Sequence, residues 1–131
     1  MAGYTKLNLK DDVEDQAPNF GLGGKLEARM ARVPLELEHS GVTYQRISPN
    51  FRVPFGHAHK QQEEVYVLVS GSLRANVAGE VLELRPLDAL RVSKDTIRGF
   101  EAGPEGAELI AIGAPSTGPG DADVHQGWWG D

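Results

Sequence analysis

Two histidines and a carboxylate lie close together in this chain, at His57, His59 and Glu64. Side chains alternate along an extended strand, so both histidines point to the same side if residues 51–59 form a strand. Glu64 opens an apolar, β-branched run at 65–69, which predicts a second, buried strand after a short turn. Two imidazoles and one carboxylate that converge from paired strands make a ligand set for a borderline divalent metal ion.

The elements that must position these side chains are predicted to be short β-strands. Ser70-Gly71 and Ala78-Gly79 are turn signals between apolar runs. Strands of this length at this spacing are typical of an antiparallel sandwich or barrel. Apolar runs separated by Gly, Pro, Asn or Asp predict strands near 42–48, 51–59, 64–70, 72–77, 80–84, 88–92, 97–102 and 107–113.

The remaining segments suggest how the chain is organised around that barrel. Residues 1–41 are predicted to form an N-terminal arm and a short helix, the helix covering 25–32 and ending before Pro34. Residues 42–114 form the predicted β-barrel. Residues 115–131 form a C-terminal tail, rich in Pro and Gly at its start, that we expect to pack on the barrel or on a dimer partner.

Composition bounds the classes of protein that this chain can represent. At 131 residues it is long enough for one domain with a core of its own. It has no cysteine, which excludes disulfides, thiolate ligands and thiol catalysis and favours a cytoplasmic protein. Residues 1–16 lack the apolar segment of a signal peptide, and no apolar run is long enough to span a membrane. The net charge of −6, without a basic stripe, argues against nucleic-acid binding.

The stretch that starts before the histidines resembles the first conserved motif of the cupin superfamily. That motif reads Gly, five residues, His-x-His, three or four residues, Glu, six residues, Gly. His57, His59, Glu64 and Gly71 fall in register, while Phe51 stands at the leading Gly position. The chain looks closest to small single-domain bacterial cupins of the conserved-barrel type. This resemblance implies an all-β fold, a single jelly-roll cupin barrel with a central pocket, and usually a homodimer.

The second cupin motif survives only in its spacing. It reads Gly, five residues, Pro, one residue, Gly, two residues, His, three residues, Asn. In metal-binding cupins its His completes a site of three His and one Glu. Arg98 stands at the position of this His in the present chain. A guanidinium has no lone pair to offer a cation and would repel it, so Arg98 cannot replace that ligand. The five motif positions hold Leu87, Ser93, Asp95, Arg98 and Ala102.

Two interpretations of the pocket follow from these residues. In the first, His57, His59 and Glu64 hold a divalent transition metal (Fe, Mn, Ni, Co, Cu or Zn) with open positions, and resemblance to metal cupins suggests dioxygenase- or isomerase-type chemistry. In the second, the metal is absent, Glu64 is ion-paired with Arg98, and the protein binds or senses a small molecule without turnover. A third interpretation, acid–base catalysis by a pocket histidine, is less favoured because no Asp is placed by sequence to orient that ring.

Three further side chains are candidates for contact with a small-molecule ligand. The planar fork of Arg98 suits a carboxylate or phosphate, so the ligand is predicted to be polar or anionic. Tyr66 shares strand parity with Glu64, and Phe100 shares it with Arg98, so both can line the pocket. The adjacent Trp128 and Trp129 are costly to leave in solvent and are expected to dock on the barrel or on a second subunit.

Overall fold

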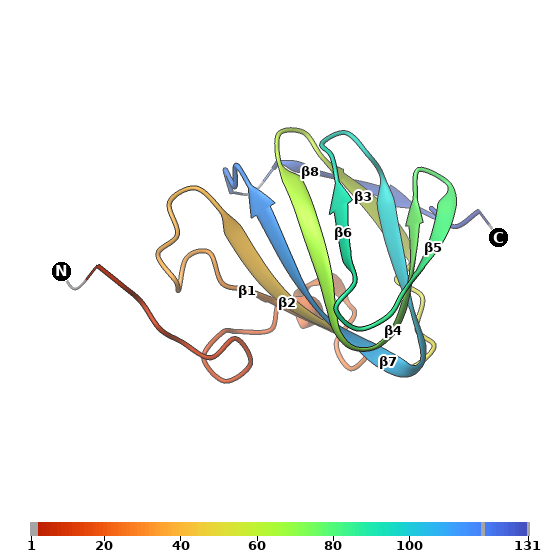
Figure 1. Ribbon diagram of the computed structural model, residues 1–131, viewed down its shortest axis with the longest axis horizontal. Coiled ribbons are helices and arrows are strands. Elements are labelled where there is room, and N and C mark those ends of the chain that lie inside the picture. Colours follow the sequence, from red (N-terminus) through yellow and green to blue (C-terminus); the bar gives the residue numbers. More distant parts are fainter. Residues whose placement is uncertain (1–2, 119, 131) are drawn as a thin grey trace.

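Two long, bent strands organise the fold, β4 (Glu63–Val77) and β7 (Arg98–Ala114). They pair antiparallel along nearly their whole length, and both bend near the middle, so that their halves lie in different walls of the barrel (Figure 1). The computed structural model describes residues 3–118 and 120–130. Within these residues one 3-10 helix, η1 (Ala17–Phe20), accompanies the two long strands and the shorter strands β1 (Leu26–Met30), β2 (Gly41–Ile47), β3 (Phe55–His59), β5 (Glu80–Leu84), β6 (Ala89–Val92) and β8 (Ala122–Gln126).

The pairing of the strands builds two walls. Five strands are hydrogen-bonded to their neighbours in the order β1-β2-β7-β3-β8. The long strand β4 lies outside this order and pairs with β5, β6 and β7. The first half of β4 pairs with β6 and with the second half of β7, whereas its second half pairs with β5 and with the first half of β7. The all-β barrel that the sequence predicts is therefore confirmed. Strands predicted separately at 64–70 and 72–77 are one continuous strand, as are those at 97–102 and 107–113.

Gly71 sits at the bend of β4, where the register against β7 shifts. Its φ of 84° lies in the left-handed region, and a Cβ at this position would approach the carbonyl oxygen of Gly106 to 2.0 Å. Only glycine relieves both constraints, because any other residue carries a Cβ. The last residue of the His57–Gly71 motif is thus explained by the crossing of the two long strands.

The helix predicted over 25–32 is wrong, because this segment forms β1. It pairs antiparallel with β2, from Leu26 opposite Ile47 to Met30 opposite Thr43. The segment Leu-Glu-Ala-Arg-Met alternates apolar and charged residues, which is the period of a strand with one buried face. Pairing with β2 and burial of this face outweigh the weak helical preference of the same residues.

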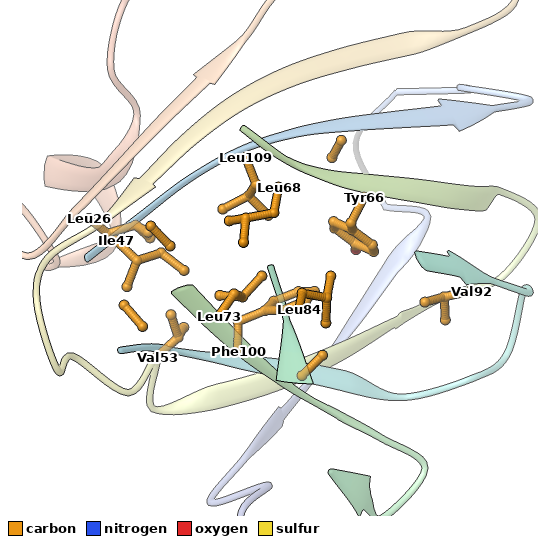
Figure 2. Packing of buried hydrophobic residues seen from close by; sticks show 14 of the residues in the cluster. Leu26, Ile47, Val53, Tyr66, Leu68, Leu73, Leu84, Val92, Phe100 and Leu109 are labelled. Carbon is orange, nitrogen blue, oxygen red and sulfur yellow. The ribbon is translucent and has the colours of Figure 1, made fainter. Parts of the chain in front are cut away.

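The hydrophobic core lies between the two walls. In Figure 2, Leu26 and Ile47 lie toward one end of the buried cluster, and Tyr66 and Val92 toward the other. Part of this cluster also lines the barrel cavity. The residues common to the core and the cavity are Leu26, Val53, Tyr66, Phe100 and Ala111.

The segment after the barrel returns to it as a strand. β8 pairs antiparallel with β3, with Val124 opposite His57 and Ala122 opposite His59. Beyond it, the indole of Trp128 covers the backbone of Gly56, where a Cβ would come within 2.7 Å of the ring, and its Nε1 donates to a main-chain carbonyl of β4 at 3.0 Å. The division of the chain at residues 42 and 114 stays a prediction, but the strands on both sides of that segment are hydrogen-bonded into the same sheet.

The N-terminal arm follows the outside of the barrel and points away from it at its start (Figure 1). Asp15 forms an isolated bridge with Arg29 of β1, and its carboxylate accepts hydrogen bonds from the backbone of Ala17 and Ala28 at 2.9 Å. No helix in the described part of the chain is long and apolar enough to cross a membrane.

Candidate metal centre

The structure brings His57, His59 and Glu64 together inside the barrel. The two histidines come from β3 and the glutamate from the start of β4, after a turn at 60–62. Oε1 of Glu64 lies 3.2 Å from Nε2 of His59 and 3.7 Å from Nε2 of His57. One ligand atom from each residue falls within 4.8 Å of the others. The two histidines therefore lie on one side of their strand, as we expect from the sequence. The strands that carry the cluster are not paired with each other, however; β3 and β4 both pair with β7.

The distances from Glu64 to the two histidines suit ligands of a single metal ion, although the three ligand atoms as a group spread over as much as 4.8 Å and would have to draw together around it. Bonds from a divalent metal to imidazole nitrogen or carboxylate oxygen are about 2.0–2.2 Å, so two neighbouring ligand atoms on one ion lie roughly 3.0–3.4 Å apart. The separations of 3.2 and 3.7 Å from the Glu64 oxygen are close to this range. Two nitrogens and one carboxylate on one side of an ion leave positions open for a ligand.

Glu64 is held as an anion by its surroundings. The Tyr66 hydroxyl donates to its Oε1, and Nε2 of Gln62 donates to its Oε2 at 2.9 Å. Burial by itself would raise the pKa of Glu64, but hydrogen bonds with His57, His59 and Tyr66 outweigh it and hold the pKa well below its ordinary value. Burial raises the pKa of Tyr66 well above its ordinary value, so this phenol remains a donor.

The two histidines differ in their electrostatics. Burial lowers the pKa of His57, and the charge of Arg98 adds to this effect, while the hydrogen bond with Glu64 opposes it. The net lowering favours the neutral ring, which keeps a lone pair. Burial also opposes protonation of His59, yet Glu64 and Asp121 together raise its pKa above the ordinary value. A metal ion that binds at these nitrogens has to compete with a proton mainly at His59.

Asp121 is a residue of the site that sequence reasoning missed. It immediately precedes β8, is 8% exposed, and places Oδ2 3.0 Å from Nδ1 of His59. Its other oxygen accepts a hydrogen bond from the backbone of Gln61 at 3.0 Å. With Nδ1–H donating to this carboxylate, the free lone pair of His59 is on Nε2 and faces Glu64, as in metal sites whose histidines are oriented by an outer carboxylate. The expectation that no Asp orients a pocket histidine is therefore wrong.

The contact of Asp121 with His59 could not be predicted from the sequence, because it depends on the pairing of two strands that are far apart in the chain. Asp121 lies 62 residues from His59, in a Pro- and Gly-rich stretch that is typical of a loop. The pairing of β8 with β3 carries it to the histidine, and no local periodicity marks that pairing beforehand.

Arg98 lies next to the centre without neutralising it. It is 0% exposed, pairs with His57 across β3 and β7, and its Nη1 donates to the carbonyl oxygen of His57 at 3.4 Å. Its Nε and Nη2 are buried without a hydrogen-bond partner, and its guanidinium carbon lies 5.9 Å from the ring centre of Tyr66. The ion pair between Glu64 and Arg98 that the metal-free interpretation requires is not formed between these described residues. Glu64 pairs with the two histidines instead.

One cavity of about 670 Å³ connects the candidate ligands with the predicted ligand-binding residues. Tyr66 and Phe100 line it with their rings 4.8 Å apart, and Arg98 lines it as well. Its volume is within the range of pockets for small organic molecules. His125, a histidine near the C-terminus, is exposed on β8 and does not belong to the cluster of His57, His59 and Glu64.

Comparison with known proteins supports the fold. No family model matches the chain, and no curated protein sequence matches it. Among solved structures, a cupin protein from Bacteroides fragilis is 25% identical with a TM-score of 0.71, and the match covers 89% of this chain and 88% of that one.

Two enzymes are among the other similar structures. Pac13 from Streptomyces, a nucleoside dehydratase, is 14% identical with a TM-score of 0.69, and the match covers 93% of this chain and 92% of that one. Oxalate decarboxylase from Bacillus subtilis is 18% identical with a TM-score of 0.73, covering 91% of this chain but 32% of that longer one. The barrel, its bend at Gly71 and these likenesses together show that the chain has the fold of the cupin superfamily.

Proposed function

We propose that this protein binds one divalent transition metal through His57, His59 and Glu64 and uses it to hold a small polar or anionic organic molecule in the barrel. The observation that carries the proposal is the convergence of the three ligand atoms within 4.8 Å at the wall of a cavity of about 670 Å³. The orientation of His59 by Asp121 at 3.0 Å supports it, because a fixed Nε2 lone pair is what a metal ligand needs.

The residues around the centre suit dioxygenase- or isomerase-type chemistry on such a molecule. A bound divalent ion would supply Lewis acidity, and iron, manganese or copper would also supply electrons. Tyr66 and Gln62 fix the carboxylate of Glu64, Phe100 offers an apolar face to the ligand, and Arg98 places a buried positive charge beside it. A negative group on the ligand would satisfy the unpartnered donors of Arg98.

Elemental analysis tests the metal. The protein is reconstituted anaerobically with each candidate ion, desalted and measured beside His57→Ala and His39→Ala. His39 is the matched control, because its side chain is 91% exposed and lies outside the cluster. We expect one ion per chain in the native protein and in His39→Ala, and a large loss in His57→Ala. The absence of stoichiometric metal from the native protein would refute the proposal.

A second candidate function is metal-free acid–base catalysis by the dyad of His59 and Asp121. The hydrogen bond of 3.0 Å between them favours it, since a carboxylate that orients an imidazole is the usual arrangement of a general base. Nitrogen NMR of the histidine rings distinguishes the two functions. A metal bound at Nε2 removes the titration of His59 between pH 5 and pH 9, whereas a metal-free dyad titrates in that range and does not respond to a chelator.

A further inference from the structure

A second arginine lines the same cavity as the metal centre, at some distance from it. Arg32 follows β1, and the hydrogen bond of 2.8 Å from Ala31 N–H to the carbonyl of Val42 keeps this part of the chain beside β2. The Nε of Arg32 is buried without a hydrogen-bond partner. In the part of the chain that the structure describes, Arg32 also has no ion pair, although the protein carries a net charge of −6. The cavity thus has an unneutralised cation at this end.

The sheet register gives the separation of the two ends. Glu64 lies opposite Gly113 across β4 and β7, and Gly113 lies opposite Gly41 across β7 and β2. The register of β1 with β2 ends at Met30 opposite Thr43, and the hydrogen bond from Ala31 to Val42 continues it, so the same register puts Arg32 next in this row, beside Gly41. Neighbouring strands are about 4.7–4.9 Å apart, so three steps place Arg32 roughly 14 Å along the sheet from Glu64. The ligand that reaches both ends is therefore longer than a two- or three-carbon acid.

The wall between these ends is largely apolar. The adjacent row runs from Tyr66 over Ala111 and Thr43 to Met30, and these residues line the cavity. Met30 is 49% exposed and Val33 is 77% exposed, and both lie on this cavity at the end near Arg32. Large apolar side chains that remain this exposed on a concave surface are typical of a ligand site.

We infer that the cavity binds an elongated organic anion with its carboxylate on Arg32, its apolar middle over Thr43 and Met30, and its other end at the metal centre. The inner end of this arrangement rests on the proposed function. The outer end rests on the unpartnered cation and the apolar wall. A carboxylate that reaches the buried Nε of Arg32 gains a charge-assisted hydrogen bond, which is stronger than one between neutral groups.

Calorimetric titration of the protein as purified tests this inference with three acids, namely succinate, suberate and octanoate. Suberate has a carboxylate at each end, octanoate has the same length with one carboxylate, and succinate is too short to span the row. We expect suberate to bind more tightly than both. The single carboxylate of octanoate is expected at the metal centre beside Arg98, where the positive charge is greater than at Arg32. We therefore expect Arg32→Met to weaken suberate binding about tenfold and to leave octanoate binding unchanged. Arg91→Met, which removes an exposed arginine of β6, is the matched control and changes neither affinity.

A second variant tests the path along the wall without a change of charge. Thr43→Leu places a larger side chain in the middle of the row, and we expect it to weaken suberate and octanoate binding while succinate binding is unchanged. The inference is overturned if no diacid binds, or if Arg32→Met lowers the affinities for suberate and octanoate equally while the melting temperature is unchanged. The metal content of each sample is measured in parallel. Failure of the proposed function then appears as missing metal, and failure of this inference as a lost suberate preference in protein that contains metal.

Discussion

Replacement of Asp121 by Asn changes one atom of a side chain and disturbs the protonation of the candidate metal centre. In the native protein, both carboxylate oxygens accept hydrogen bonds, one from Nδ1 of His59 and one from the backbone N–H of Gln61, each at 3.0 Å. An asparagine has one acceptor and one donor group. If its amide faces His59, it donates to Nδ1 and moves the ring proton to Nε2. If its amide faces Gln61, two donors oppose each other.

The expected loss of metal affinity follows from these two orientations of the asparagine side chain. The first orientation removes the Nε2 lone pair that faces Glu64 at 3.2 Å, and the second leaves a donor without a partner in a side chain that is 8% exposed. Loss of an outer carboxylate on a metal-ligating histidine typically costs 10- to 100-fold in metal affinity. We therefore expect Asp121→Asn to weaken metal binding by about 10- to 100-fold, which corresponds to about 1.4–2.7 kcal/mol.

Competition with a chromophoric chelator measures this affinity, and Asp123→Asn is the matched control. Asp123 lies two residues further on, its side chain is 57% exposed, and it pairs with Lys60 at 3.6 Å. It carries the same charge two residues away, on β8 itself, but does not touch a histidine of the cluster. If Asp121→Asn and Asp123→Asn bind metal within twofold of each other, the argument that Asp121 sets the tautomer of His59 is wrong.

Three further predictions concern the fold and its charges. Gly71→Ala should lower the free energy of unfolding by about 3 kcal/mol or more, because the added Cβ meets a backbone oxygen. Gly79→Ala, at a φ of 94° but with open space around it, should lower it by about 1 kcal/mol. Urea denaturation compares the two variants, and equal losses of stability would refute the steric reasoning. Arg98→Met should raise both the melting temperature and the metal affinity, the latter about tenfold or more, since it removes a buried cation with two unpartnered donors; unchanged affinity in the chelator assay would contradict this. The hydrogen bond from Arg46 lowers the pKa of Glu27, so the stability that Glu27 contributes is complete above its ordinary pKa of 4.5 and is lost as the pH falls through the lower folded value. The difference in unfolding free energy between the native protein and Glu27→Gln should thus shrink from pH 6 to pH 3, and a constant difference would speak against the ion pair.

Much of the barrel could be predicted from local patterns. Alternating apolar residues separated by Gly, Pro, Asn and Asp located the strands of the middle segment, because burial of one face imposes a period of two. The same alternation is present in Leu26–Met30, which forms β1, but the segment is short and its residues also favour helices. The prediction of a helix there follows from that ambiguity. The exposed β8 carries no such pattern, so its pairing with β3 could not be predicted.

The sequence by itself determined the all-β class and the placement of His57, His59 and Glu64 on one side of their strands. It did so because the alternation of side chains along a strand acts over a few residues. Only the tertiary structure decided that Glu64 pairs with the histidines instead of Arg98, and that Asp121 reaches His59. These contacts depend on which distant strands become neighbours. Which strands become neighbours is decided by the closure of the whole barrel and not by the residue pattern of any one segment.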